Sequence, residues 1–171
     1  MTTITTSIFG SGIHIAVNPV NTVGVMGAGL ALEFKQRYPK MYQAYRAACQ
    51  SGRLVIGKVH IWDIPETGAE WSMVKPRSIA VIINLPTKAH WRSPSFWTQI
   101  EPAARFMVKA LQHIKYPVLF GFRPRVGIPR LGSGLGGLSW TEIKPLLEPI
   151  LAPLEPEYEV VFVEPPYRML A

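Results

Sequence analysis

Apolar residues recur along the chain with two different periods, and each period predicts one type of secondary structure. Strict alternation, or a short continuous run rich in β-branched residues, predicts a strand. Six segments fit this description: residues 3–8, 13–17, 56–64, 78–85, 124–131 and 157–164. The segment "SIAVIINL" (78–85) is apolar almost throughout and a proline follows it, so we expect a buried strand there.

Helical spacing marks the remaining long segments: residues 29–37, a second piece that ends at residue 49, residues 95–114 and residues 139–151. Pro39 separates the first two helices, and Gly52 is the expected C-cap of the second. Pro102 lies inside the third and predicts a kink or a late start. Ser139 and Glu142 predict a capping box at the start of the fourth, which two further prolines make irregular.

Strands that alternate with helices predict an α/β sandwich with a mixed sheet, and such folds gather their chemistry in loops at one edge of the sheet. The chain has 171 residues, enough for one domain with a sizeable core and too few for two. We therefore expect residues 1–171 to form a single domain.

Composition narrows the class of protein further. Hydrophobic residues make up 48% of the chain and charged residues 17%, which is typical of a globular protein rather than a disordered one. No apolar run reaches the roughly 20 residues of a membrane span, and the N-terminus lacks the basic region and cleavage site of a signal peptide. The single cysteine, Cys49, cannot form an internal disulfide, so we expect a cytoplasmic protein with no membrane partner.

Positive charge exceeds negative charge, with 18 Lys and Arg against 11 Asp and Glu and a net charge of +7. This excess favours an anionic partner such as nucleic acid, a nucleotide or phosphate, and it does not distinguish between them. The cations are scattered singly rather than in a block, so an ordinary basic surface is the alternative.

Two glycine-rich loops each lie between an expected strand and an expected helix. The first, residues 18–34, lacks the Lys-Ser or Lys-Thr of a Walker A loop and the spacing of a Rossmann fingerprint, so turn geometry alone is an alternative. The second, residues 129–140, repeats the arrangement with four glycines. Glycine lets the backbone approach a ligand closely, and free N–H groups at a helix start favour anions. Two such loops in one small domain predict a site for a nucleotide diphosphate.

Few other residues offer catalytic chemistry. The two loops contain no acidic residue except Glu33, so the paired carboxylates of a glycosidase cannot be assembled there. The 4 histidines lack metal-ligand spacing, so we expect no metal. Cys49 has the helical surroundings of an ordinary packed cysteine, with a Cys-His nucleophile as the alternative. Lys88 is the best reactive group, because it follows the buried strand in "NLPTKAHWR" beside other cations. A lysine so placed loses proton affinity and can attack an electrophilic carbon; the alternative is a solvated loop lysine.

Three motifs resemble the macrodomain family: "VNPVNTVGVMGAGLALEFKQRYP", "INLPTKAHWR" and "PRLGSGLGGLSWTEIKPLLE". They are most similar to its branch of DNA ADP-ribosyl glycohydrolases, the DarG-type antitoxins, to which terminal ADP-ribose protein glycohydrolases are related. The motifs occur in order across nearly the whole chain. The resemblance implies a three-layer α/β/α macrodomain fold around a central mixed sheet, with ADP-ribose bound in a cleft at the strand ends and no further cofactor.

The resemblance also implies roles for individual residues. Lys88 matches the lysine on which removal of ADP-ribose depends in this branch, and it would act at the anomeric carbon or stabilise its opening. The residues expected on the side of the leaving group, a thymine in single-stranded DNA, are Thr87, His90, Trp91 and Arg92. An aromatic face and an arginine suit base stacking and phosphate contact, with ordinary packing as the alternative for Trp91. The residues expected to bind ADP-ribose are Ser7, Ile8, Asn21, Gly24, Val25, Met26, Gly27, Gly29, Gly132, Ser133, Gly134, Leu135, Gly136 and Gly137.

Three positions depart from the family pattern. Ser7 stands where many macrodomains have an aspartate that binds the adenine amino group. Gly136 stands where the protein-directed relatives have an acidic residue, which favours the DNA-directed branch. Ala28 stands where the DarG branch often has lysine. Full antitoxins also carry a toxin-binding domain for which 171 residues leave no room, so we expect a standalone relative or the macrodomain portion alone, as a monomer.

The function that the resemblance implies is hydrolysis of ADP-ribose from thymidine in single-stranded DNA, with Lys88 as the catalytic residue. The implied partners are ADP-ribose, ADP-ribosylated single-stranded DNA and a cognate DNA ADP-ribosyltransferase toxin. Two alternatives stay open. One is hydrolysis of ADP-ribosylated protein carboxylates or O-acyl-ADP-ribose, and the other is a non-catalytic reader of ADP-ribose.

Overall fold

The computed structural model describes residues 1–64 and 78–166. Its elements are β1 (Thr2–Ile4), η1 (Ile8–Gly10), β2 (Ile15–Val20), α1 (Gly29–Arg37), α2 (Pro39–Gln50), β3 (His60–Asp63), β4 (Val81–Pro86), α3 (Trp97–Ile114), α4 (Tyr116–Phe120), β5 (Arg125–Pro129), α5 (Trp140–Leu151), η3 (Ala152–Leu154) and β6 (Glu159–Val163). The two η elements are short 3₁₀ helices. In the described ranges, no helix is both long enough and apolar enough to cross a membrane.

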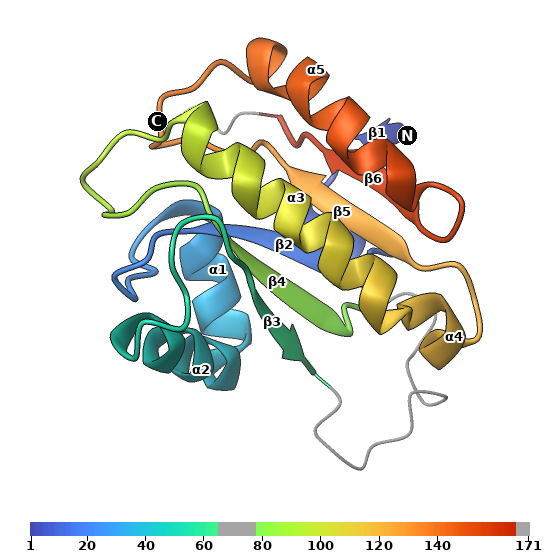
Figure 1. The fold of residues 1–171 in the computed structure, drawn as a ribbon, viewed down its shortest axis with the longest axis horizontal. Coiled ribbons are helices and arrows are strands. Elements are labelled where there is room, and N and C mark those ends of the chain that lie inside the picture. Colours follow the sequence, from blue (N-terminus) through green and yellow to red (C-terminus); the bar gives the residue numbers. More distant parts are fainter. Residues whose placement is uncertain (65–77, 167–171) are drawn as a thin grey trace.

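Six strands form one sheet in the order β1-β6-β5-β2-β4-β3. Strand β3 runs antiparallel to β4 at one edge, and all other neighbouring strands run parallel. Helices α3 and α5 cover one face of the sheet, whereas α1 and α2 cover the other (Figure 1). The structure therefore confirms the expected three-layer α/β/α fold with a central mixed sheet.

The alternation of side chains along each strand divides the apolar core into two halves. In β2, Ile15 and Val17 pack with α3 and α5, whereas Ala16 and Val20 pack with α1 and α2. Strand β4 does the same with its continuous apolar run. A strand that is buried on both faces needs no polar positions, which is why residues 78–85 show so little alternation.

One row of polar side chains crosses this core. Asn18 of β2, Asn84 of β4 and His60 of β3 are paired in register on neighbouring strands. The Asn18 amide donates to Asn84 Oδ1 at 3.0 Å, and the Asn84 amide nitrogen lies 3.0 Å from His60 Nδ1. Burial, and to a lesser extent the charge of Arg53, lowers the pKa of His60, so a neutral imidazole accepts this hydrogen bond.

Turns interrupt two of the predicted strands. Segment 3–8 is not one strand, because the Ser7 hydroxyl accepts a hydrogen bond from the Phe9 N–H at 3.3 Å and caps η1 instead. Segment 56–64 contributes only β3, because Gly57 adopts a positive φ of 87° in a turn before it. Both differences come from local turn chemistry that interrupts an apolar pattern.

The helix ends also differ from the sequence expectations. The predicted capping box at α5 is wrong: the Ser139 hydroxyl pairs with the Thr141 hydroxyl at 2.8 Å and makes no cap hydrogen bond. Helix α3 begins at Trp97, later than the expected start at residue 95, and it includes Pro102. The short helix α4 has no periodic signal and is unexpected. It follows Lys115, whose φ of 58° ends α3.

Candidate functional site

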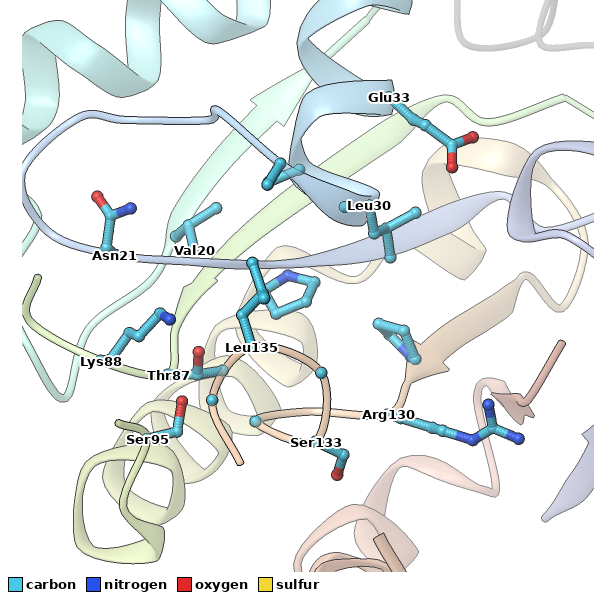
Figure 2. Close-up of a pocket in the computed structure, with 18 of the residues that line it drawn as sticks. Val20, Asn21, Leu30, Glu33, Thr87, Lys88, Ser95, Arg130, Ser133 and Leu135 are labelled. Carbon is cyan, nitrogen blue, oxygen red and sulfur yellow. The ribbon is translucent and has the colours of Figure 1, made fainter. Parts of the chain in front are cut away.

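A cavity of about 830 Å³ opens at the carboxyl ends of the parallel strands (Figure 2). Residues at or just past the ends of β2, β4, β5 and β6 line it together with both glycine-rich loops. Open α/β sheets bind their ligands at this edge. The predicted site residues that line the cavity are Ser7, Ile8, Asn21, Val25, Gly27, Gly29, Thr87, Lys88, Trp91, Gly132, Ser133, Gly134, Leu135 and Gly136.

The first glycine-rich loop is held by the side chain of Asn21, just past the end of β2. Asn21 Oδ1 accepts hydrogen bonds from the N–H groups of Val23 at 3.1 Å and Val25 at 3.3 Å, and Asn21 Nδ2 donates to the Val25 carbonyl at 2.8 Å. The Tyr45 hydroxyl of α2 lies 2.7 Å from the Asn21 carbonyl oxygen and 3.0 Å from Asn21 Oδ1. Most of the hydrogen-bonding capacity of Asn21 is therefore used within the protein, and one amide hydrogen remains for a ligand.

Three residues of the predicted binding set lie outside the cavity lining. Gly24 faces α2, where a Cβ would lie 3.2 Å from Arg46 Cγ, and its φ of +82° favours glycine. Met26 is 1% exposed and packs in the core. Gly137 has a φ of +79° in the turn before α5. These residues shape the two loops, and the structure does not bring them to the cavity.

The second glycine-rich loop faces the first across the cavity (Figure 2). A Cβ at Gly134 would meet nothing within 4 Å, because this position faces open space. A Cβ at Gly136 would overlap Ser95 Oγ and lie 2.5 Å from the Gly132 carbonyl oxygen. The Gly136 carbonyl also accepts a hydrogen bond from the Ser95 N–H at 3.0 Å. Gly134 thus leaves the loop open to a ligand, whereas Gly136 permits close packing of the loop against Ser95.

Lys88 lies at one end of the cavity, just past the end of β4 (Figure 2). Its Nζ donates a hydrogen bond to the Trp91 carbonyl oxygen at 3.1 Å, and no described carboxylate pairs with it. Burial lowers the pKa of Lys88, because it penalises the charged ammonium. Lys88 is half-buried rather than freely solvated. Because its pKa is lowered, a larger fraction of it is neutral amine near neutral pH than for an ordinary lysine.

The residues after Lys88 combine aromatic and cationic groups. Trp91 lines the cavity and is 46% exposed, so it is not part of the packed core. The His90 ring stacks on Trp91 with ring centroids 5.3 Å apart, and the Arg92 guanidinium lies 4.6 Å from the Trp91 ring centroid. His90 and Arg92 flank Trp91 but do not line the cavity. Such a surface can stack on a base and contact a phosphate.

Several cavity residues were not predicted. Glu33 follows Leu30 by three positions on α1, so helical spacing alone could have placed both at the site. Arg130 directly follows β5, and its Nη1 donates to the Pro165 carbonyl at 2.8 Å. Ser95 precedes α3 and carries no recognisable signal in the sequence. The other unpredicted lining residues are Pro19, Val20, Ala28, Leu30, Ala31, Pro129, Val163, Pro165 and Pro166.

Acidic side chains are scarce around the cavity. Glu33 is the one acidic residue among the described lining residues, and Ser7 contributes a hydroxyl. Across residues 1–64 and 78–166, no three His, Cys, Asp or Glu side chains gather as a group that could hold a metal ion. The described polar groups at this site are thus the Lys88 amine, the Arg130 guanidinium, one carboxylate at Glu33, hydroxyls and backbone N–H groups.

The sheet, the cavity at its carboxyl edge and the paired glycine-rich loops define an α/β domain with a cavity at the edge where such folds bind their ligands. The model of the macro domain family matches residues 17–147, and the chain belongs to this family. The family resemblance of the three sequence motifs is thereby confirmed.

Known relatives lie in the DarG branch of this family. A Thermus aquaticus protein named DNA ADP-ribosyl glycohydrolase is 38% identical over 143 residues, which are 84% of this chain and 35% of the relative. The chain therefore spans about a third of the length of this curated relative. The macrodomain of Mycobacterium tuberculosis DarG matches with a TM-score of 0.80 at 34% identity, over 96% of this chain and 97% of that one. Thermosipho africanus DarTG in complex with ADP-ribose matches with a TM-score of 0.75 at 30% identity, over 94% of this chain and 40% of that one.

Proposed function

We propose that this chain is a hydrolase that removes ADP-ribose from thymidine in single-stranded DNA. A relative that is named a DNA ADP-ribosyl glycohydrolase and a structural match that holds ADP-ribose support this proposal. The cavity of about 830 Å³ has the size of a small-molecule site. In the proposed complex, free backbone N–H groups of the two glycine-rich loops hold the diphosphate between them.

The orientation of the proposed ligand follows from the chemistry of the cavity walls. Apolar side chains, among them Ile8, Leu30 and Val163, line the cavity away from Lys88, and they suit the flat face of adenine. Figure 2 places Leu30 on the opposite side of the cavity from Lys88. The distal ribose, whose anomeric carbon carries the bond to the base, therefore points toward Lys88.

The observation that carries the proposal is the position of Lys88 at this end of the cavity, with a lowered pKa. Its neutral amine attacks the anomeric carbon and forms a carbon–nitrogen bond. The bond to the thymine nitrogen breaks, the base leaves with the electron pair, and it takes up the proton that the lysine nitrogen releases. Water then hydrolyses the lysine adduct, which releases ADP-ribose and restores the amine.

The platform of His90, Trp91 and Arg92 gives the leaving group a place to bind. In the proposed complex, the thymine or its neighbour in the strand stacks on Trp91, and Arg92 contacts a DNA phosphate. We propose further that residues 1–171 act as a single macrodomain and that a DNA ADP-ribosyltransferase toxin is a functional partner. The family resemblance supports both proposals.

Two labelled substrates test the reaction directly. The protein is incubated with ADP-ribosylated single-stranded DNA and, separately, with protein ADP-ribosylated on carboxylates, and the release of ADP-ribose is followed. We expect release from the DNA to be faster. Release from protein alone would assign the chain to the protein-directed relatives. Binding of ADP-ribose with no release from either substrate would make the chain a reader.

Replacing the proposed nucleophile should separate catalysis from binding. We expect Lys88→Ala to lower turnover by about 10²- to 10⁴-fold with little change in ADP-ribose affinity, because the amine acts in the transition state and backbone groups hold the diphosphate. Lys88→Arg should fail too, since a guanidinium stays charged and is a poor nucleophile. Lys109→Ala, at an exposed lysine of α3, is the control and should turn over normally. Wild-type turnover by Lys88→Ala would return Lys88 to the class of ordinary loop lysines.

The pH dependence of turnover should reveal which form of Lys88 acts. Burial lowers the pKa of Lys88, so the neutral amine accumulates at a lower pH than for a solvated lysine. For attack by the amine, the single-turnover rate should rise with pH through this pKa and then level off. A rate that falls over the same range would assign the catalytic role to the charged ammonium, as a stabiliser of the departing base.

A further inference from the structure

One buried hydroxyl of the cavity has no partner within the described chain. Ser95, just before α3, is 2% exposed, and its Oγ makes no hydrogen bond to any described residue. Buried hydroxyl groups are almost always hydrogen-bonded, so an unpaired one needs an explanation. Because Ser95 also lines the cavity, a bound ligand can provide the missing partner.

Ser95 is held in a fixed position by the second glycine-rich loop. Its N–H donates to the Gly136 carbonyl at 3.0 Å, so the hydroxyl is the group that remains available. A Cβ at Gly136 would overlap Ser95 Oγ, and a Cβ at Gly132 would lie 3.2 Å from Ser95 Cβ. A side chain packed this closely has little freedom left to lose when a ligand binds.

The hydroxyl lies at the catalytic end of the cavity. Figure 2 shows Ser95 beside Thr87 and Lys88, and all three line the cavity. Thr87 is also buried, with 4% of its surface exposed. On the other side of the view lie Glu33 and Arg130, near the apolar wall that suits adenine. Ser95 is thus close to the group that acts on the distal ribose and away from the adenine.

We propose that the Ser95 hydroxyl binds the distal ribose of ADP-ribose and positions its anomeric carbon for Lys88. This inference rests on the proposed function and adds a positioning residue to it. A serine hydroxyl donates one hydrogen bond and accepts two, which matches the hydroxyl groups of a ribose. The diphosphate already has backbone N–H groups on two loops, whereas the distal ribose has to rely on side chains at this end.

Comparison of two ligands tests the inference, because ADP lacks the distal ribose. Calorimetry measures the affinity of the wild type and of Ser95→Ala for ADP-ribose and for ADP. We expect Ser95→Ala to weaken ADP-ribose binding by about three- to ten-fold, the usual effect of one hydrogen bond, and to leave ADP binding unchanged. Ser51→Ala, at an exposed serine just past α2, is the control and should bind both ligands as the wild type does.

A second variant covers the case in which Ser95→Ala does not fold. Ser95→Cys fills the same position with a weak hydrogen-bond donor, so it should show the same selective loss in smaller measure. Equal losses for ADP-ribose and ADP would mean that Ser95 only shapes the loop, and unchanged affinities would mean that the hydroxyl does not touch the ligand. Either result overturns the inference while the proposed function stands. A wild type that binds ADP but not ADP-ribose overturns both.

Discussion

The two glycine-rich loops line the same cavity, but different interactions hold them in place. Side chains hold the first loop: Asn21 bonds to its backbone, and the Tyr45 hydroxyl supports Asn21 from α2. The second loop depends on the absence of side chains, because Gly136 leaves room for Ser95 behind it. The two loops therefore differ in what holds them: the first needs particular polar side chains in addition to its glycines, whereas the second depends on its glycines alone.

The strongest test of this contrast is Gly136→Ala. The added Cβ would overlap Ser95 Oγ and the Gly132 carbonyl oxygen, and backbone cannot move aside as a flexible side chain can. We expect a loss of about 3 kcal/mol in the free energy of unfolding, measured by chemical denaturation. A variant as stable as the wild type would show that the second loop can relax, and the contrast between the loops would disappear.

Gly134→Val changes a nearby glycine of the same loop, and we expect it to lower ligand affinity rather than stability. The new side chain points into open cavity space, so the free energy of unfolding should be nearly unchanged. The proposed diphosphate lies in that space, and the valine side chain and the diphosphate cannot occupy it together. ADP-ribose affinity should therefore fall by about 100-fold or more. Calorimetry on the folded variant measures this. Unchanged affinity would place the ligand elsewhere in the protein.

Tyr45→Phe tests the support of the first loop. It removes a hydroxyl that lies 2.7 Å from the Asn21 carbonyl oxygen and leaves that buried oxygen without this donor. We expect a loss of about 1 kcal/mol in stability and a few-fold loss of ADP-ribose affinity, because the loop is less well ordered. The matched control is Tyr42→Phe, whose hydroxyl makes a longer 3.2 Å hydrogen bond to the Gly24 carbonyl. Equal effects of the two variants would contradict a special role for Asn21.

The smallest expected effect concerns the platform beside the loops. DNA-linked ADP-ribose should bind with a steeper salt dependence than free ADP-ribose, because in the proposed complex Arg92 displaces a counterion from a DNA phosphate. Arg92→Gln should reduce the slope of log affinity against log salt by about 0.7 for the DNA ligand and leave free ADP-ribose unaffected. Arg105→Gln on α3 is the control. Identical slopes for both ligands in the wild type would argue against a DNA path over this surface.

Long periodic segments of the fold could be predicted from the sequence, and short irregular ones could not. Helix α1 has the expected bounds, and β4 lies where the apolar run predicts it, because burial against the core fixes both. The cap of α5 and the break at Ser7 depend on which of several nearby groups a hydroxyl pairs with. A one-dimensional pattern does not contain that choice, because the alternatives differ by little free energy.

The candidate site shows the same division. Motifs at strand ends led to Lys88 and to both loops, because the carboxyl edge of a sheet brings together residues that are far apart in the sequence. Gly24 and Met26 belong to the same motif but face the protein, which only the turn geometry reveals. Ser95 is the opposite case, because it lies at the cavity although nothing in its sequence context marks it. Packing against Gly136 brings it to the cavity wall.

The polar row of Asn18, Asn84 and His60 has a consequence for how the sheet assembles. A continuous apolar strand such as β4 can shift its register against its neighbours at little cost in free energy, since nearly every position carries an apolar side chain. A shift of one residue would separate the two amides and bury each without a partner, which costs several times more than an imperfect apolar contact. The polar row of Asn18, Asn84 and His60 thus fixes the register of these strands. It selects one register for the three strands, two of which, β2 and β4, deliver Asn21 and Lys88 to the same edge.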